Sequence, residues 1–224
     1  MRKHSSRGHP VTSDRAVLLA HGAGSDRNSP ALLAVADRLT AVGIPSSRFD
    51  YPYRQAGRRA PDRPAVLEQA TREAAAELAK GMDLPPERLV LGGRSMGGRY
   101  CSMVAGHETE PVPALGLVLL GYPLHPAGKP EQLRTAHFPR LTMPVLFVSG
   151  DRDALAPRPA LEEAATAIPG SVTFHWLPGA DHGYRVPKSS GRVPADILNE
   201  VAEVTAAWVA ALSAMPGTPR TPVG

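Results

Sequence analysis

The sequence has one cysteine, Cys101, so the chain cannot form an intrachain disulfide. This excludes the class of small secreted folds that disulfides hold together. Long hydrophobic runs are also missing: Ala114–Leu124 is about half of the roughly 20 residues that a membrane-spanning helix needs. The first residues carry positive charge with no apolar stretch behind them, so we expect no secretory signal. These absences predict a cytoplasmic protein with no membrane partner.

Aromatic residues are scarce, at 5% of the chain, and this limits what the net charge of +4 can mean. Nucleic-acid-binding proteins that hold single strands use aromatic side chains as stacking platforms. The arginine cluster of this chain lies in a loop rich in Pro and Gly without such aromatics, at Arg54, Arg58, Arg59 and Arg63. We therefore expect no nucleic-acid partner. The cluster is either a solvated loop or a site that attracts an anionic substrate.

Motifs that bind metal are absent as well. The sequence has no His-x-His, and His107-Glu108 lacks the second histidine of a His-Glu-x-x-His motif. Cys101 falls in the interior of an expected helix, where a buried free thiol is the usual arrangement. We expect no metal and no cofactor, so any chemistry must come from ordinary side chains.

What the sequence does contain is an alternation of short apolar runs and segments with helical spacing. The expected strands are Ala16–Ala20, Arg48–Tyr51, Leu89–Gly92, Leu115–Gly121, Val145–Ser149 and Val172–Leu177. The expected helices are Pro30–Val42, Pro64–Lys80, Met96–Ala105, Pro159–Ile168 and about 195–212. Strands that are apolar along their whole length and separated by helices indicate a parallel sheet covered on both faces. The predicted fold class is α/β: a doubly wound, mostly parallel sheet of about six strands flanked by helices.

A chain of 224 residues fits one such domain, which we place at 15–213. The flanking segments 1–14 and 214–224 lack apolar periodicity, and the second is rich in Pro, Gly and Thr. We expect both to be disordered tails.

The most informative motif is Gly93-Arg94-Ser95-Met96-Gly97, which follows an expected strand and opens an expected helix. Strand, Gly-x-Ser-x-Gly and helix is the arrangement that exposes a nucleophilic serine at the edge of a sheet. The turn leaves no space for side chains at the positions two residues before and two residues after the serine, which explains the two glycines. Ser95 is therefore the candidate nucleophile, and the N–H of Met96 faces the same space.

A serine hydroxyl needs a base to take its proton and an acid to orient that base. In a doubly wound sheet such partners lie in loops that follow strands. One strand runs into Gly150-Asp151-Arg152-Asp153 and the last into Pro178-Gly-Ala-Asp-His182. The order serine, acid, histidine is that of α/β-hydrolases, with His182 as the base. Asp153, Asp151 and Asp181 are all candidates for the acid.

These motifs, together with His21-Gly-Ala-Gly24 and Gly121-Tyr-Pro-Leu-His-Pro126, resemble the α/β-hydrolase superfamily over about residues 15–212. In detail they resemble its dienelactone-hydrolase-like branch, which includes the testis-expressed protein 30 and NSL-complex subunit 3 type of domain. The resemblance implies that the catalytic carboxylate is the second of the Gly-x-x-Asp pattern, Asp153. It also implies that Ala23 supplies a second oxyanion-hole N–H beside Met96, and that His21 braces this loop.

The predicted function is a serine hydrolase that cleaves a carboxylic ester or a related small acyl substrate without a cofactor. Pro123–Thr142 spans about 20 residues, which is long enough for a flap and too short for a cap domain. We expect the pocket rim to include Tyr51–Arg54, Tyr122 and His125, and arginine there to favour anionic or polar esters. The sequence leaves the oligomeric state open.

Two other functions fit parts of the sequence. Gly22-Ala23-Gly24 after a strand, with Asp50 after the next, begins a dinucleotide-binding motif, but Arg27 stands where its third glycine belongs. A non-catalytic binding or scaffold protein on a hydrolase fold is the second alternative, because fold does not imply function. No residue of the serine motif or its partners is missing, which favours the hydrolase.

Overall fold

A computed structural model describes residues 13–213 of the chain. The two predicted tails, 1–14 and 214–224, lie outside this range apart from Ser13 and Asp14. Asp14 is held by ion pairs with Arg15 and Arg88, at 2.8 and 3.1 Å.

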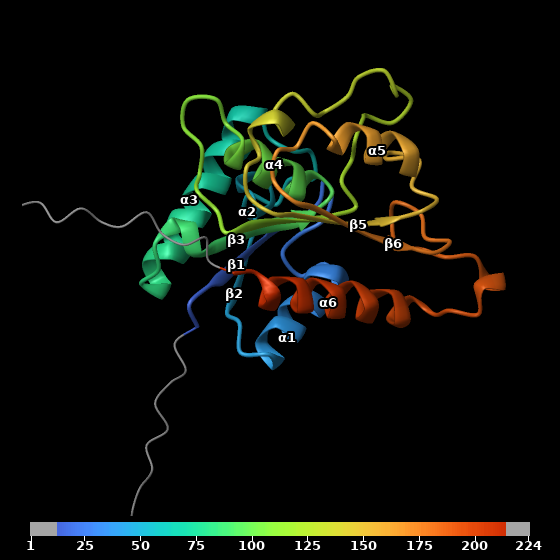
Figure 1. Ribbon diagram of the computed structural model, residues 1–224, viewed down its shortest axis with the longest axis horizontal. Coiled ribbons are helices and arrows are strands. Elements are labelled where there is room, and N and C mark those ends of the chain that lie inside the picture. Colours follow the sequence, from blue (N-terminus) through green and yellow to red (C-terminus); the bar gives the residue numbers. More distant parts are fainter. Residues whose placement is uncertain (1–12, 214–224) are drawn as a thin grey trace, which may run out of the picture.

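The centre of the molecule is one sheet in which all neighbouring strands run parallel, in the order β2-β1-β3-β4-β5-β6 (Figure 1). The strands are β1 Ala16–Ala20, β2 Ser46–Phe49, β3 Leu89–Arg94, β4 Gly116–Leu120, β5 Val145–Gly150 and β6 Val172–Leu177. This confirms the predicted α/β class and the expected number of strands. The parallel arrangement follows from strands that are buried on both faces, as β1, β4 and β5 are along their whole length.

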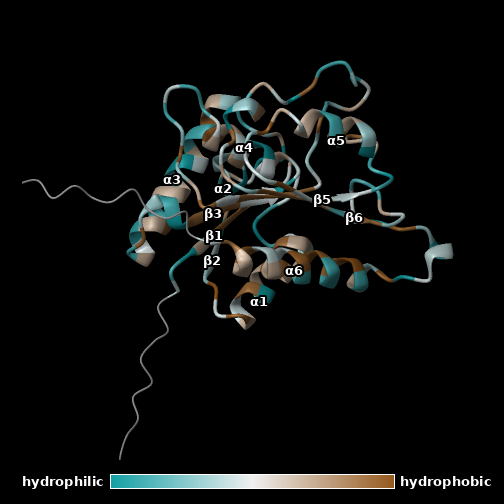
Figure 2. Ribbon diagram, viewed as in Figure 1, coloured by the Kyte–Doolittle hydropathy of each residue, from teal (hydrophilic) through white to brown (hydrophobic). Residues whose placement is uncertain are grey.

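Helices cover both faces of this sheet. The α-helices are α1 Pro30–Ala41, α2 Pro52–Gln55, α3 Pro64–Met82, α4 Met96–Ala105, α5 Arg158–Ala165 and α6 Pro194–Ala211. In Figure 1, α1 and α6 lie together below the sheet, and α3, α4 and α5 lie above it. Figure 2 shows apolar strands at the centre and a mixture of polar and apolar residues on the helices around them.

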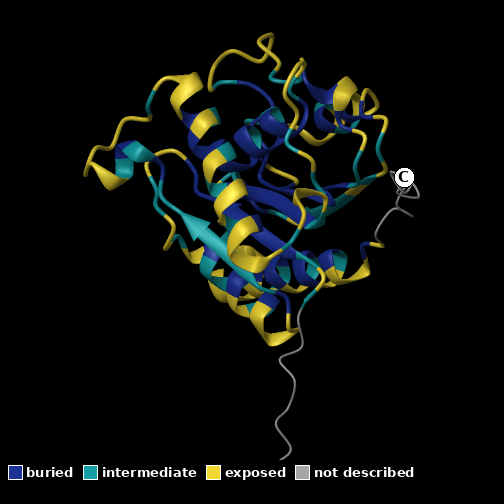
Figure 3. Ribbon diagram, turned by 90° about the vertical axis from the view of Figure 1, so that its left-hand side faces the viewer, coloured by how far each residue is buried: buried dark blue, intermediate teal, exposed yellow. Residues whose placement is uncertain are grey.

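The side chains of β1 point alternately to the two faces of the sheet, and each face has its own hydrophobic core. Ala16, Leu18 and Ala20 pack with α3 and α4 on one face. Val17 and Leu19 point to the other face and pack with α1 and α6. Figure 3 shows the central strands buried and the edge strand β2 only partly covered. Within residues 13–213, no helix has the length and apolar character to cross a membrane.

Several element boundaries differ by one to three residues from those expected from the sequence. The second strand lies at Ser46–Phe49 rather than at Arg48–Tyr51, and the short helix α2 begins immediately after Tyr51. The cause is Pro52, which fixes its own φ for the first turn of a helix and keeps Tyr51 extended. Strand β3 also continues through Gly93 and Arg94, because these residues still pair with Leu119 and Leu120 of β4.

The order of the strands changes direction at β1: β2 is added on one side of β1 and β3 on the other. From β1 the chain moves outward to β2, and it then returns to place β3 on the other side of β1. Ligands of doubly wound folds bind at this point, outside the carboxyl ends of the strands. The loops that leave β1 and β3 here contain His21 and Ser95, so both residues lie where a ligand of this fold is expected.

The start of α4 lies unusually close to the end of β1. A Cβ atom added to Gly93 or Gly97 would collide with the backbone carbonyl oxygen of Ala20. Both glycines of the serine motif are thus required by the contact between β3, α4 and β1, and not only by the turn.

We predict that Gly97→Ala lowers the free energy of unfolding by about 2 kcal/mol, because backbone atoms must move apart. Gly81→Ala is the matched control: it lies in α3, and an added Cβ there meets no atom within 4 Å. This control is expected to gain about 0.5 kcal/mol from helix propensity. Urea denaturation of both variants measures the difference. A Gly97→Ala variant as stable as the wild type would contradict the close approach.

Candidate active site

Ser95 occupies the sharp turn between β3 and α4. Its backbone has φ 51° and ψ −114°, a conformation that residues with side chains rarely adopt. The turn is held by its own N–H, which donates to the carbonyl of Leu120 at 2.9 Å. This strained geometry lifts the Ser95 hydroxyl out of the sheet and leaves it partly exposed.

A chain of two hydrogen bonds joins this serine to a histidine and a carboxylate from other loops. Ser95 Oγ lies 2.9 Å from His182 Nε2, and His182 Nδ1 lies 2.7 Å from Asp153 Oδ2. An ionised carboxylate only accepts hydrogen bonds, so Nδ1 carries the imidazole hydrogen and Nε2 accepts the hydrogen of the serine hydroxyl. The side chains come from the loops after β3, β5 and β6, which are distant in sequence and adjacent at the sheet edge.

The carboxylate of Asp153 is buried and held in one orientation beside this histidine. Its side chain is 0% exposed, whereas that of His182 is 27% exposed. The second carboxylate oxygen, Oδ1, accepts the N–H of Leu155 at 2.8 Å, so the carboxylate cannot rotate freely. The buried carboxylate therefore has both oxygens satisfied, one by its own loop and one by the imidazole.

The other two candidate acids shape loops instead. Asp151 Oδ1 accepts the N–H of Gly179 at 2.7 Å and so ties the loop after β5 to the loop after β6. Asp181 Oδ1 accepts the N–H groups of Gly183 and Arg185, which closes the turn around His182. The structure thus brings Asp153 to the histidine and assigns local bracing to its two neighbours.

The two expected oxyanion donors, Ala23 and Met96, line the same cavity as Ser95. Met96 is the first residue of α4, where the backbone N–H has no partner within the helix and the helix dipole favours negative charge. Ala23 lies in the loop that leaves β1. Both residues thus border the space beside Ser95, and their role as oxyanion donors stays a prediction.

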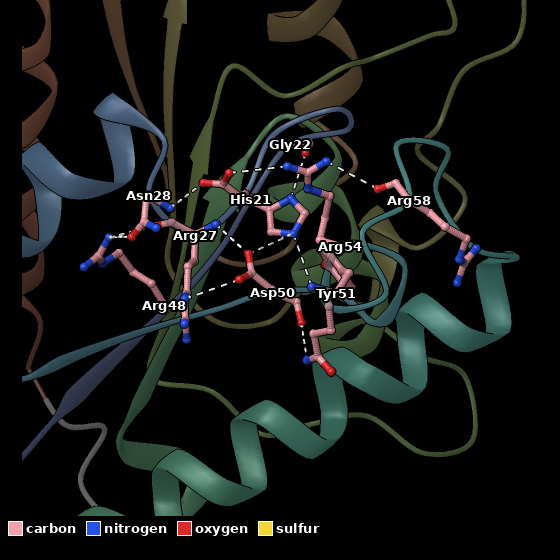
Figure 4. A network of polar contacts seen from close by, with 11 residues as sticks. His21, Gly22, Arg27, Asn28, Arg48, Asp50, Tyr51, Arg54 and Arg58 are labelled. Carbon is pink, nitrogen blue, oxygen red and sulfur yellow. Dashed lines mark hydrogen bonds and ion pairs between the residues drawn. The ribbon is translucent and has the colours of Figure 1, made fainter.

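His21 braces the loop that carries Ala23, as expected (Figure 4). Its Nδ1 lies 2.8 Å from the carbonyl of Gly22, and its Nε2 accepts the N–H of Tyr51 at 3.2 Å. This pattern requires a neutral ring with hydrogen on Nδ1. Burial lowers the pKa of His21, which favours the same neutral form.

Figure 4 also shows Asp50 and Arg54 within a network of polar contacts. Asp50 Oδ1 accepts the N–H of Arg27 at 2.8 Å, so the acid that a dinucleotide-binding protein would use for ribose is engaged within the loop. Arg54 donates to Asp26 and to the carbonyl of Arg58. Arg54 is therefore part of a loop network rather than a free cation at the pocket.

A cavity of about 430 Å³ opens beside Ser95. It is lined by residues of the loop after β1, the loop before α3, helices α3 and α4, and the loops after β4 and β5: Ala23, Pro61, Asp62, Pro64, Leu67, Ser95, Met96, Arg99, Tyr100, Pro123, His125, Pro126, Ala127, Arg134 and Leu155. Of the three residues expected at the substrate, His125 lines this cavity.

Tyr51 and Tyr122 do not line it, and the structure corrects their expected position. Both side chains are fully buried. The Tyr51 hydroxyl lies 3.2 Å from Thr71 Oγ1, and the Tyr122 hydroxyl donates to the carbonyl of Arg134 at 2.5 Å. Their sequence position after strands is compatible with a rim. Burial of a large aromatic surface in the core decided their direction instead.

Arg94 was not among the residues indicated by the sequence, although it lies inside the serine motif. Its guanidinium donates to the carbonyls of Leu120, at 3.1 Å, and of His182. It also lies 4.3 Å from the centre of the Tyr184 ring. A Cβ on Gly121, which has φ +58°, would collide with this guanidinium. One side chain thus connects the serine turn, the loop after β4 and the backbone of the histidine loop.

Tyr184 completes this connection. It has a φ of 64°, and its buried hydroxyl donates to the carbonyl of Val148 in β5 at 2.8 Å. Burial raises the pKa of this phenol, which therefore remains a donor. The turn that carries His182 is fixed to the sheet on one side and to Arg94 on the other.

Cys101 is a buried free thiol, as expected, and burial raises its pKa to about 12. Its Sγ donates to the carbonyl of Gly92 at 3.2 Å. Across the described part of the chain, no three His, Cys, Asp or Glu side chains are grouped so that they could hold a metal ion.

A parallel sheet with a serine on a strand–turn–helix elbow, contacted by a histidine and a buried carboxylate from later loops, defines the class of α/β-hydrolase folds. The model of one family, described as an alpha/beta hydrolase domain, matches residues 13–210. The chain belongs to this family.

Solved structures of similar fold include several hydrolases. A dienelactone hydrolase from Anabaena variabilis is 21% identical, with a TM-score of 0.68, and the match covers 89% of this chain and 87% of that one. Est1E from Butyrivibrio proteoclasticus, with ferulic acid bound, is 17% identical, with a TM-score of 0.66 and coverage of 88% and 90%. An alpha-beta serine hydrolase homologue from Coxiella burnetii is 17% identical, with a TM-score of 0.66 and coverage of 86% and 85%. At these identities the likeness is one of fold.

The Arg94 contacts predict a local effect. In Arg94→Met, amide hydrogen exchange of Asp181, Gly183, Tyr184 and Arg185 should accelerate by about tenfold or more, because their turn loses a charged donor. Arg152→Met, a change of an exposed arginine in the neighbouring loop, should leave these amides as they are. Unchanged exchange in Arg94→Met would show that the turn holds itself without the guanidinium.

Proposed function

We propose that the protein is a serine hydrolase that cleaves a carboxylic ester or a related acyl compound through an acyl-enzyme. The observation that carries this proposal is the hydrogen-bonded chain from Ser95 through His182 to Asp153. A serine hydroxyl is a weak nucleophile by itself, and an adjacent neutral imidazole is the group that activates it. We further propose that the protein belongs to the dienelactone-hydrolase-like branch and acts in the cytoplasm.

In the first half of the reaction, Ser95 Oγ attacks the carbonyl carbon of the substrate while its proton moves to His182 Nε2. The buried carboxylate of Asp153 keeps the ring in position and stabilises the imidazolium that forms. The negative charge that develops on the carbonyl oxygen is stabilised by the N–H groups of Ala23 and Met96. The tetrahedral intermediate then collapses, and the leaving alcohol takes the proton from Nε2.

In the second half, water attacks the acyl-enzyme and gives its proton to His182 Nε2. The same two N–H groups hold the second oxyanion, and collapse releases the carboxylic acid and restores the Ser95 hydroxyl. No cofactor is needed, since bond cleavage requires only a nucleophile, a base and charge stabilisation. The cavity of about 430 Å³ suits a small acyl substrate, with His125 at its wall.

Labelling with a fluorophosphonate probe tests whether Ser95 is activated. We expect one adduct on the wild-type protein by intact mass and none on Ser95→Ala, which should fold normally because the hydroxyl contributes little packing. Loss of the nucleophile should reduce ester hydrolysis by on the order of a millionfold. No adduct on the well-folded wild type would favour a binding or scaffold protein, and an adduct that survives in Ser95→Ala would point to another serine.

The choice of acid has a separate test. Asp153→Asn should lower kcat by about 10⁴-fold, because an amide at this position no longer stabilises the protonated imidazole and favours the wrong tautomer. Asp151→Asn is the matched control, since its oxygen can still accept the N–H of Gly179, and we expect a change of a few fold. Steady-state kinetics on a neutral ester such as phenyl acetate compares the two. The reverse ranking would overturn the assignment of Asp153.

A further inference from the structure

Two arginine side chains line the cavity beside Ser95: Arg99 from α4 and Arg134 from the segment between β4 and β5. Arg99 follows Ser95 by four residues, and its N–H donates to the Ser95 carbonyl at 3.0 Å. Side chains of a helix lean toward its N-terminus, so the Arg99 stem leans toward the turn that carries the nucleophile. A positive charge is therefore built into the wall next to the reacting group.

The Arg99 guanidinium is incompletely used by the protein. Its Nε is buried and has no hydrogen-bond partner. The centre of the Tyr100 ring lies 5.2 Å from the guanidinium carbon. In the part of the chain that the structure describes, neither Arg99 nor Arg134 forms an ion pair with a carboxylate. A half-buried cation without an acid is costly unless a ligand supplies the negative charge.

Arg134 is held in place through its backbone. Its N–H donates to the carbonyl of Leu124 at 2.8 Å, and its own carbonyl accepts the hydroxyl of the fully buried Tyr122 at 2.5 Å. Burial and the positive charge of Arg99 lower the pKa of Arg134. The two guanidinium groups thus repel one another in a partly desolvated site, and an anion between them would relieve that repulsion.

The cavity wall also holds one acidic side chain, Asp62, which forms no ion pair with Arg99 or Arg134. Asp62 Oδ1 is paired with Arg58 at 2.6 Å, and its buried Oδ2 has no hydrogen-bond partner. Arg54, the arginine expected at the rim from sequence, is engaged by Asp26. The positive charge available to a ligand therefore comes from α4 and the segment after β4, and not from the arginine-rich loop.

We propose that Arg99 and Arg134 form an anion subsite beside Ser95, so that the substrate is an acyl compound that bears a carboxylate or a phosphonate-like group. This inference rests on the proposed function for its chemistry, and on the two unpaired arginines for its specificity. Guanidinium groups present forked donors that match the oxygens of carboxylate and phosphate. The anionic group would anchor the substrate while the ester carbonyl lies at Ser95.

Hydrolysis of matched esters tests the subsite. Monomethyl adipate carries a carboxylate, dimethyl adipate and methyl hexanoate are neutral, and methyl 5-phosphonopentanoate carries a phosphonate. For wild type we expect kcat/KM for one of the anionic esters to exceed that for the neutral esters by about tenfold or more. The comparison of the two anionic esters distinguishes carboxylate from phosphonate. Added salt should reduce the preference, because it screens a partly exposed charge.

Variants then assign the preference to residues. Arg99→Gln and Arg134→Gln should each lower the anionic-to-neutral ratio by about tenfold. Arg38→Gln is the charge-matched control, since Arg38 lies in α1 on the opposite face of the sheet and pairs with Glu203. Its ratio should equal that of the wild type. Neutral esters cleaved as well as the anionic ones, or a ratio that survives in both cavity variants, would overturn the subsite.

Binding separates this inference from the proposed function. If the wild type cleaves none of these esters, the hydrolase proposal fails, and calorimetry of the Ser95→Ala variant with monomethyl adipate and with methyl 5-phosphonopentanoate still tests the subsite. Binding that is lost when Arg99→Gln or Arg134→Gln is added, and kept with Arg38→Gln, supports the anion site. Absence of binding by both anions overturns it.

Discussion

The close approach of β1, β3 and α4 is the constraint on which the candidate site depends. Gly93 and Gly97 let the backbone of the serine turn come into contact with the carbonyl of Ala20. This contact places the first turn of α4 beside the loop that leaves β1. The nucleophile and the two N–H groups expected to hold an oxyanion are thereby brought to one cavity, at the point where the strand order reverses.

The second requirement is that loops from distant parts of the chain keep a fixed spacing. Hydrogen bonds to backbone atoms provide this spacing: Asp151 joins the loops after β5 and β6, and Arg94 joins the serine turn to the carbonyl of His182. Tyr184 anchors the same loop to β5. A nucleophile and a base must meet within hydrogen-bond distance, so groups that never touch a substrate contribute to the geometry.

The arginines of the cavity differ from those of the arginine-rich loop in whether an acid is paired with them. The arginine-rich loop gives the sequence its most visible cluster of positive charge, yet Arg54 is paired with Asp26 and Arg58 with Asp62. Arg99 and Arg134 are separate in sequence and inconspicuous, but they share a cavity wall without acidic partners. Local net charge in a sequence therefore does not show which arginines lack an acidic partner, since pairing depends on neighbours that the sequence does not reveal.

The sequence by itself determined the strand and helix pattern and the residues offered for chemistry. A buried parallel strand requires a continuous apolar run, and a strained serine turn requires flanking glycines, so both leave a local record in the order of residues. Only the tertiary structure decided which of Asp151, Asp153 and Asp181 contacts His182, and that Tyr51 and Tyr122 turn into the core. These outcomes depend on the direction of side chains and on partners brought together by packing. No short stretch of sequence encodes such long-range contacts.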